Sequence, residues 1–366
     1  MNQKQIIIND NYSALDALFS GKKTFLVCDS SYGFLKIGEH FDKLIESGFE
    51  IIKFSDFTPN PDYISVKEAV KLYKENGCDT ILAIGGGSAM DLAKCVKLYA
   101  NMSDKEEYIN QQIIPNDIPL YAVPTTAGTG SEATRYAVIY YNGNKQSIAD
   151  LSCIPSVVVF DSSVLKTLPE YQRKATMMDA FCHSIESFWS VNSTDESKEL
   201  SKQAISLILD NMDAYLANDD EGNKNMLKAA NTAGKAINIT QTTAGHAMCY
   251  KLTSLYGIAH GHAAALCVNA LLPYMTANTQ NCIDSRGEEY LKGVFLQIAD
   301  ALHCDSTDEL CEKFSSIVSK LGLSSPEYKE EDFEILKNSV NPTRLKNNPV
   351  SLSVDTIDML YHQILR

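Results

Sequence analysis

Thr80-Ile81-Leu82-Ala83-Ile84-Gly85-Gly86-Gly87-Ser88 is the stretch that shows how this chain folds. Its first five residues are apolar or β-branched, which predicts a short buried strand, and residues 89–100 follow with the pattern of a helix. The three glycines let the backbone pass close to phosphate oxygens, and the free N–H groups at the start of a helix favour negative charge. The stretch therefore predicts a strand, a phosphate-binding turn and a helix, in that order.

The same alternation of short apolar runs and helical patterns continues on both sides of this unit. We predict further strands at residues 24–28, 49–54 and 119–124, and helices at residues 37–47 and 62–76. Beyond Thr167 the pattern becomes helical, with no strand expected after Phe160 and with helices expected at residues 169–189, 193–216, 223–239, 246–255 and 262–278. The expected architecture is an α/β domain with a Rossmann-like parallel sheet at residues 1–166, followed by an all-helical domain at residues 167–366.

The composition is that of an ordinary globular protein, with 45% hydrophobic and 21% charged residues in a chain of 366. A net charge of −14 argues against nucleic acid or an anionic membrane as a partner. The ten cysteines include no C-x-x-C pair, residues 1–4 begin no apolar signal region, and no apolar run reaches membrane-spanning length. We therefore expect a cytoplasmic protein with free thiols.

A set of possible metal ligands lies in the helical half. Asp179 and His183 are four residues apart, so their side chains would share one face of a helix. His246 and His260, fourteen residues apart, add two more imidazoles. Any one of these histidines alone would be read as a surface or core residue. Together, one carboxylate and three imidazoles suit Fe²⁺ or Zn²⁺ and leave a coordination position for a substrate oxygen.

These residues resemble the iron-dependent, or group III, alcohol dehydrogenases. The resemblance rests on the D-x-x-x-H pair, the fourteen-residue interval between the later histidines, the Gly after the last one, and residues 85–94, which look like the family's pyrophosphate loop. It implies a dehydroquinate synthase-like fold and an Fe²⁺ or Zn²⁺ ion held by Asp179, His183, His246 and His260. It also implies an enzyme that transfers hydride between a nicotinamide cofactor and a small aldehyde or primary alcohol.

The same resemblance implies where the cofactor binds. Residues 59–61 and 124–132 match two further cofactor segments of the family. The residues implied in binding NAD(H) are Asp29, Asn60, Gly86, Gly87, Ser88, Asp91, Thr125, Thr126, Thr129 and Lys145. Asp29 would accept hydrogen bonds from the ribose and repel a 2′-phosphate, which favours NAD(H), with NADP(H) as the alternative. Asp29 and Lys145 each have an alternative to a role in cofactor binding. Asp29 would only cap the turn at residues 29–31, and Lys145 would be an exposed lysine.

The implied reaction is the reversible reduction of an aldehyde. The metal would polarise the carbonyl and stabilise the alkoxide, and the nicotinamide would deliver hydride in a cleft between the domains. Tyr250 departs from the family, which often has a histidine there, and a tyrosine carries protons poorly at neutral pH. Ala259 stands where the family usually has proline, and His262 is an additional histidine. We expect a homodimer.

Two cations bear on the choice of substrate. Arg135 follows the second cofactor loop and Lys251 lies between two metal ligands, so in an acidic protein they favour a substrate with a negative group. This pattern resembles the phosphonoacetaldehyde reductase branch of the family. The alternative is that both cations form surface or interdomain salt bridges. Rival interpretations of the whole chain are a Zn²⁺-dependent glycerol dehydrogenase, a dehydroquinate synthase, and a nucleotide- or metal-binding protein without turnover.

Overall fold

The computed structural model describes residues 3–8 and 11–366 of the chain. Its larger sheet has six parallel strands in the order β1-β8-β5-β4-β2-β3. The strands of this sheet are β1 (Lys4–Ile8), β2 (Thr24–Cys28), β3 (Ile51–Phe54), β4 (Thr80–Gly85), β5 (Leu120–Pro124) and β8 (Val157–Asp161). The prediction of a parallel sheet in the first part of the chain is confirmed.

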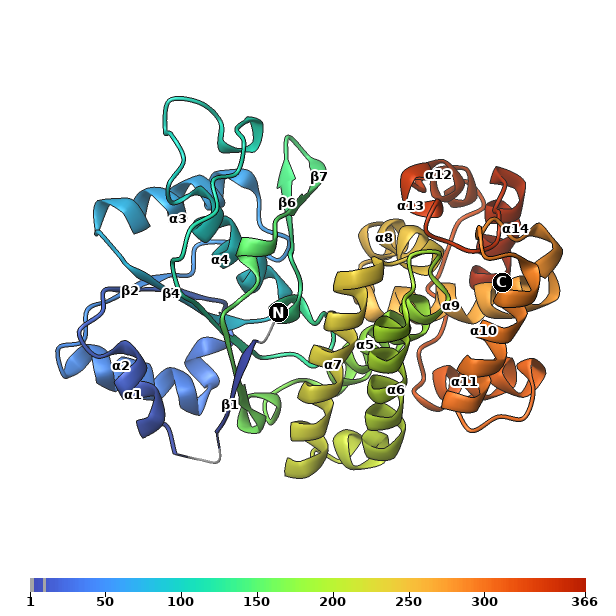
Figure 1. The fold of residues 1–366 in the computed structure, drawn as a ribbon, viewed down its shortest axis with the longest axis horizontal. Coiled ribbons are helices and arrows are strands. Elements are labelled where there is room, and N and C mark those ends of the chain that lie inside the picture. Colours follow the sequence, from blue (N-terminus) through green and yellow to red (C-terminus); the bar gives the residue numbers. More distant parts are fainter. Residues whose placement is uncertain (1–2, 9–10) are drawn as a thin grey trace. The chain divides into compact units, whose positions relative to one another are not determined.

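Burial explains why these strands pair in parallel. The residues of β2, β4, β5 and β8 are mostly apolar and are buried at every position. Such strands need helices over both faces of the sheet. The covering helices are α1 (Ser13–Phe19), α2 (Lys36–Glu46), α3 (Tyr63–Glu75) and α4 (Gly87–Tyr99). Figure 1 shows α1 and α2 on one side of the sheet and α3 and α4 on the other.

The sequence patterns did not predict the edge strand β1, the strand β8 or a separate hairpin. β1 pairs with β8, with Lys4 opposite Val157. The hairpin consists of β6 (Tyr136–Tyr141) and β7 (Asn144–Ala149), which pair antiparallel around Asn142 and Gly143. Both turn residues have positive φ, the conformation that a tight hairpin turn requires. Short, half-exposed strands carry little hydrophobic pattern, so their pairing partners decide whether they form.

In the part of the chain that the structure describes, only helices follow β8. They are α5 (Glu170–Trp189), α6 (Asp195–Leu216), α7 (Asp220–Thr240), α8 (Ala244–Tyr256), α9 (His260–Ala277), α10 (Glu288–Ala301), α11 (Thr307–Lys320), α12 (Asp332–Ser339), α13 (Pro342–Leu345) and α14 (Val354–Leu365). The buried helix α5 packs against α6 and α9, and α9 packs against α8. Among the described residues, no helix combines the length and the apolar character needed to cross a membrane.

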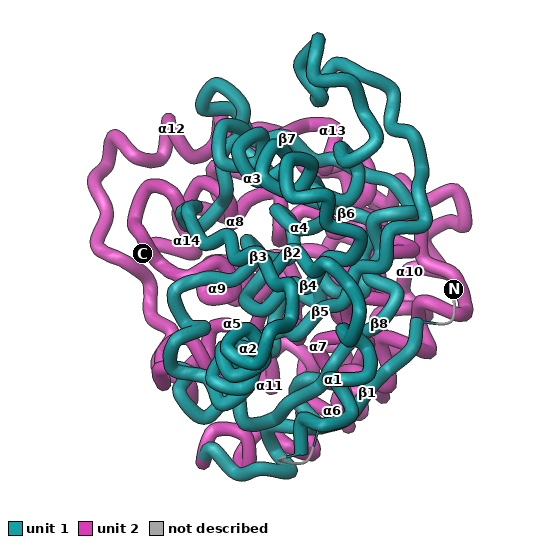
Figure 2. Tube along the Cα trace, turned by 90° about the vertical axis from the view of Figure 1, so that its left-hand side faces the viewer, with its two compact units in different colours: residues 1–168, 218–227 teal, residues 169–217, 228–366 magenta. Residues whose placement is uncertain are grey.

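The chain divides into two compact units, coloured separately in Figure 2. The first unit comprises residues 1–168 and 218–227, and the second comprises residues 169–217 and 228–366. The sheet lies in the first unit and α5 begins the second. The first turns of α7 belong to the first unit, although they follow α5 and α6 in the chain.

Candidate metal centre and cofactor loops

One buried face of α5 carries three ionisable side chains. Asp179, His183 and Glu186 follow one another at helical spacing, so they lie on the same side of the helix. Their exposed fractions are only 2%, 5% and 0%, respectively. Because ionisable groups are rarely buried without partners, this face is expected to meet complementary groups.

Imidazoles from α8 and α9 meet this face. His246 Nε2 lies 3.3 Å from Asp179 Oδ1, and the His246 ring stacks on the His183 ring with 4.4 Å between centroids. The His260 ring meets the His246 ring at 5.4 Å. One ligand atom each of Asp179, His246 and His260 lies within 4.8 Å of the others, and His183 Nε2 is 3.9 Å from Asp179 Oδ1. The structure thus brings together the four residues that the sequence suggested as metal ligands.

This donor set fits a divalent metal ion. One carboxylate oxygen and several imidazole nitrogens are ligands that both Fe²⁺ and Zn²⁺ accept. Burial by itself would raise the pKa of the Asp179 carboxyl. The imidazoles of His183, His246 and His260 outweigh burial and hold that pKa well below its usual value. Asp179 is therefore ionised at neutral pH and able to bind a cation.

Glu186 belongs to this centre although the sequence patterns did not single it out. It accepts a hydrogen bond from Nδ1 of His246, which leaves Nε2 of that ring facing Asp179. Glu186 Oε1 also accepts hydrogen bonds from the Thr243 hydroxyl at 2.5 Å and from the backbone N–H groups of Thr243 and His246 at 3.2 and 3.3 Å. Glu186 therefore caps the start of α8 and orients the His246 ring. The signal in the sequence was a glutamate one further helical turn beyond the D-x-x-x-H pair.

The contact between Glu186 and His246 sets the pKa of both groups. Burial would raise the pKa of the Glu186 carboxyl, but the neighbouring His246 holds it below its ordinary value. Burial would lower the pKa of His246, but Glu186 and Asp179 raise it to about 9. A metal ion that binds His246 therefore displaces a proton, because only the neutral imidazole is a ligand.

Two glycines allow the helices around this centre to approach closely. A Cβ on Gly245 would lie 2.9 Å from Glu186 Oε1 and 2.8 Å from a methyl carbon of Val268. A Cβ on Gly261 would lie 2.0 Å from the carbonyl oxygen of Ala175. Such distances are too short for real side chains in a close-packed interior. Glycine at these two positions is therefore a requirement of the packing that brings α8 and α9 to α5.

A series of hydrogen bonds holds the segment before His260. The backbone N–H of Ala259 donates to the Tyr171 hydroxyl at 2.9 Å, and that hydroxyl lies 3.0 Å from Nδ1 of His262. Nε2 of His262 lies 3.0 Å from the carbonyl oxygen of Ser324, and because a carbonyl oxygen only accepts, this nitrogen is the donor. When the Tyr171 hydroxyl donates to Nδ1, the His262 ring carries a single proton and is neutral. Burial lowers the pKa of His262, which favours that neutral form. The additional histidine thus positions the turn that carries His260.

Tyr250 of α8 lies against His260. The two rings stack with 5.3 Å between centroids and 22° between planes. The Tyr250 hydroxyl accepts a hydrogen bond from Nη1 of Arg344, a residue of α13 that lies outside every sequence motif. Burial raises the pKa of the Tyr250 phenol, so this group keeps its proton at neutral pH. Lys251, the next residue of α8, is half-buried.

In the first unit, three of the expected cofactor segments meet at the start of α4. Asp29 Oδ2 accepts a hydrogen bond from the Gly86 N–H at 2.9 Å, and Asp29 Oδ1 accepts hydrogen bonds from the N–H and hydroxyl groups of Ser31. The backbone N–H of Asn60 donates to the Ser88 hydroxyl at 3.0 Å. Asp29 therefore caps its own turn, as the alternative interpretation held, and also ties that turn to the glycines.

The loop with the threonines approaches the same glycines. A Cβ on Gly86 would lie 3.5 Å from Thr126 Cγ2, and a Cβ on Gly87 would lie 3.2 Å from Thr129 Cγ2. The backbone N–H of Thr125 donates to the carbonyl oxygen of Gly85 at 3.0 Å. Backbone N–H groups at a helix start, together with nearby hydroxyls, suit a phosphate group.

Asp91 and Lys94, both on α4, hold the threonine loop in place. Asp91 accepts hydrogen bonds from the Ser131 hydroxyl at 2.9 Å and from the Val138 N–H at 3.1 Å. The ammonium group of the fully buried Lys94 donates to the carbonyl oxygens of Ser131 at 2.6 Å and Tyr136 at 2.7 Å. Both carboxylate oxygens of Asp91, which was expected to bind the cofactor, thus accept hydrogen bonds that position the loop. Burial raises the pKa of this carboxyl.

Three cations were expected from the sequence to bind the cofactor or an anionic substrate, and they lie in different units. Lys145, on β7, is near enough to Asp91 for its charge to lower the pKa of that carboxyl against the effect of burial. Arg135 precedes β6, and its guanidinium carbon lies 5.7 Å from the centre of the Tyr136 ring. Both residues belong to the first unit, whereas Lys251 belongs to the second unit with the metal-ligand candidates.

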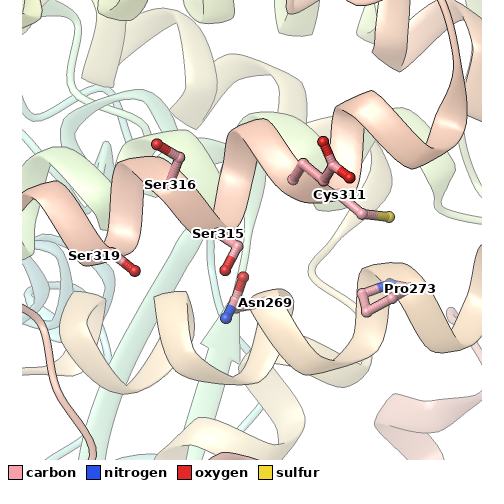
Figure 3. Close-up of a pocket in the computed structure, with 7 residues that line it drawn as sticks. Asn269, Pro273, Cys311, Ser315, Ser316 and Ser319 are labelled. Carbon is pink, nitrogen blue, oxygen red and sulfur yellow. The ribbon is translucent and has the colours of Figure 1, made fainter.

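A surface groove runs between α9 and α11 and encloses about 500 Å³. The residues that line it are Asn269, Pro273, Cys311, Glu312, Ser315, Ser316 and Ser319. Figure 3 shows Ser315 of α11 directed toward Asn269 of α9. None of the lining residues is a candidate metal ligand or cofactor contact, so the groove is not part of the candidate site.

Two family models cover almost the whole chain. The model described as iron-containing alcohol dehydrogenase matches residues 3–162. The model described as the C-terminal part of the Fe-containing alcohol dehydrogenase family matches residues 174–365. Among curated relatives, the 1,3-propanediol dehydrogenase of Citrobacter freundii is 32% identical over 267 residues, which cover 70% of this chain and 68% of that protein.

Solved structures agree with these matches. A 1,3-propanediol oxidoreductase has a TM-score of 0.84 and 26% identity, over 99% of this chain and 98% of that chain. The sulfoacetaldehyde reductase of Bifidobacterium kashiwanohense, solved with NAD⁺, has a TM-score of 0.83 and 24% identity, over 99% of this chain and 96% of that chain. The second comparison shows a shared fold.

Proposed function

This chain belongs to the iron-containing alcohol dehydrogenase family, and we propose that it reduces a small aldehyde with NADH and oxidises the corresponding alcohol in reverse. The observation that carries the proposal is the buried cluster of Asp179, His246 and His260, whose ligand atoms lie within 4.8 Å of one another. His183 stacks on His246 in the same cluster and is the fourth proposed ligand. The chain is thus an oxidoreductase with the ligand set for a divalent metal.

The residues of the second unit prepare this centre for the metal. A bound Fe²⁺ or Zn²⁺ ion supplies a Lewis acid that polarises the aldehyde carbonyl. Asp179 contributes the negative charge of the ligand set, because its pKa is held low. Glu186 holds the His246 ring so that Nε2 is turned toward Asp179. Tyr250 keeps its proton, so it acts as a hydrogen-bond donor beside His260 and not as a proton carrier.

The residues of the first unit are proposed to bind the dinucleotide. Gly86, Gly87 and Ser88 begin α4, where backbone N–H groups favour the diphosphate. The hydroxyls of Thr126 and Thr129 lie near Gly86 and Gly87 and are proposed to add hydrogen-bond donors. Thr125, whose backbone N–H bonds the carbonyl oxygen of Gly85, is proposed to bind with them. Asn60 and Lys145 are proposed to lie along the cofactor, and Asp29 to accept hydrogen bonds from the adenosine ribose. A protein of the same fold, the sulfoacetaldehyde reductase, was solved with NAD⁺, which supports a nicotinamide cofactor here.

Anaerobic assays of metal-loaded protein test this function. We expect oxidation of NADH with short aldehydes after reconstitution with Fe²⁺ or Zn²⁺, and loss of turnover after chelation of the metal. Protein that holds one metal ion and NADH yet turns over no aldehyde would refute the proposal and favour a binding protein. Faster oxidation of glycerol than of simple primary alcohols would favour the glycerol dehydrogenase interpretation.

Two expectations about the state of the protein remain proposals. The ten cysteines are all free thiols, which favours a reducing compartment such as the cytosol. The chain is proposed to work as a homodimer, which sedimentation equilibrium of the metal-loaded protein would test.

A further inference from the structure

Arg344 is linked to the metal-ligand candidates through one aromatic ring. Its Nη1 donates a hydrogen bond to the Tyr250 hydroxyl at 3.1 Å, and its guanidinium carbon lies 5.1 Å from the centre of the Tyr250 ring. The Tyr250 ring also stacks on the His260 ring, with 5.3 Å between their centres. Both distances are measured from the centre of the Tyr250 ring. Their sum is therefore the upper limit of the distance between the Arg344 guanidinium carbon and the centre of the His260 ring.

Arg344 differs in its charge partners from two other arginines of the second unit. Arg286 pairs with Asp284 at 2.6 Å, and Arg366 pairs with Glu330 at 2.8 Å. Among the described residues, no carboxylate forms an ion pair with Arg344, although the chain carries 46 acidic residues. Arg344 is half-buried, and a charged group in that setting is normally balanced by an opposite charge. Its charge is thus available to a ligand.

We propose that Arg344 binds the negative group of the substrate, and that the substrate is a short aldehyde carrying a phosphonate, sulfonate or carboxylate. This inference rests on the proposed function, because the aldehyde end must reach the metal centre beside His260. The planar fork of a guanidinium suits the paired oxygens of these anions, and Nη1 is the nitrogen of the fork that donates to Tyr250. The contact of Arg344 with the Tyr250 ring and the stacking of that ring on His260 keep the cation near the candidate ligand.

The two cations expected from the sequence have weaker support in the structure. Lys251 directly follows Tyr250 on α8, so its side chain leaves the helix about 100° away from that of Tyr250. Arg135 lies in the first unit, with its guanidinium over Tyr136. Of these three cations, Arg344 is the one that donates a hydrogen bond to Tyr250, the residue whose ring stacks on His260.

Steady-state kinetics of charge-removing variants test the role of Arg344. The substrates are phosphonoacetaldehyde, sulfoacetaldehyde and succinic semialdehyde, compared with the neutral butyraldehyde. The variants are Arg344→Gln and, as a matched control, Lys346→Gln, which removes an exposed charge two residues further on. We expect Arg344→Gln to lower kcat/KM for at least one anionic aldehyde on the order of 10- to 100-fold, mainly through KM. Butyraldehyde should change by less than about threefold, and Lys346→Gln should leave both classes unchanged.

Two results would overturn the inference while leaving the proposed function intact. One is equal loss of kcat/KM for anionic and neutral aldehydes in Arg344→Gln, which would make Arg344 a support for Tyr250. The other is a wild-type enzyme that uses butyraldehyde as efficiently as every anionic aldehyde. The three anionic substrates also show which oxyanion the site prefers.

Binding of a redox-inert anion separates this inference from the proposed function. Ethylphosphonate has no carbonyl group, and calorimetry measures its binding to the metal-loaded protein without turnover. We expect its Kd to rise about tenfold or more in Arg344→Gln and to stay unchanged in Lys346→Gln. If no aldehyde is turned over but this difference appears, the proposed function fails and the anion site stands. If ethylphosphonate binds both variants alike, or does not bind the wild type, the anion site is refuted.

Discussion

Glu186 of α5 accepts a hydrogen bond from Nδ1 of His246 of α8, although the two residues are 60 positions apart in the chain. The other nitrogen of the same ring lies 3.3 Å from Asp179 Oδ1. A carboxylate on one ring nitrogen fixes the tautomer and the orientation of a histidine that binds metal through the other. Glu186 therefore acts on the metal centre through His246, without being one of the proposed ligands.

Replacing Glu186 should weaken metal binding. Glu186→Ala frees the His246 ring and leaves the N–H groups of Thr243 and His246 without their acceptor. We expect metal affinity to fall on the order of 10- to 100-fold, with a smaller loss in Glu186→Gln, which keeps an oxygen acceptor. Chelator competition with Co²⁺ measures the Kd, and Glu199→Gln, on the exposed surface, is the control. Wild-type metal affinity in Glu186→Ala would contradict this role.

Gly245→Ala should destabilise the protein because its Cβ would meet Glu186 and Val268 at less than 3 Å. We expect a loss of about 1–3 kcal/mol in the free energy of unfolding, the usual effect of overpacking. Gly293→Ala on α10 is the matched control, since nothing lies within 4 Å of a Cβ there. That control should be neutral or stabilise by up to about 1 kcal/mol. Urea unfolding of the metal-free variants checks both values, and equal stabilities would refute the packing argument.

His246→Ala and His260→Ala should each lose bound metal and activity together, because the remaining ligands form an incomplete set. Metal analysis of protein prepared without air, alongside NADH oxidation, measures both. His40→Ala is the control, since His40 pairs with Asp16 in the first unit. A histidine variant that keeps one metal ion per chain would show that the replaced residue is not a ligand.

Asp29→Gly should shift the cofactor preference toward NADPH by removing a negative charge from beside the proposed ribose site. Both cofactors should bind more weakly, because the Gly86 N–H also loses its acceptor. We therefore expect the ratio of kcat/KM for NADPH over NADH to rise on the order of tenfold. Ser31→Ala disturbs the same turn but keeps the charge, so its ratio should match the wild type. An unchanged ratio in Asp29→Gly would leave Asp29 as a turn residue only.

Local patterns in the sequence predicted four strands of the parallel sheet, the long helices and the four metal-ligand candidates. Strand β4, the glycine turn and α4 could be predicted because their signals lie within a few neighbouring residues. The D-x-x-x-H pair could be placed on one helix face for the same reason. The edge strand β1 could not be predicted, because it depends on pairing with β8, about 150 residues away.

The tertiary structure alone decided that Glu186 contacts His246 and that Arg344 contacts Tyr250. Glu186 is an ordinary helical glutamate in the sequence, and only the packing of α8 on α5, permitted by Gly245, brings it to His246. Arg344 belongs to no motif, and only the fold of α13 beside α8 places it on Tyr250. Contacts between residues far apart in the chain follow from the packing of whole helices, which no local spacing encodes.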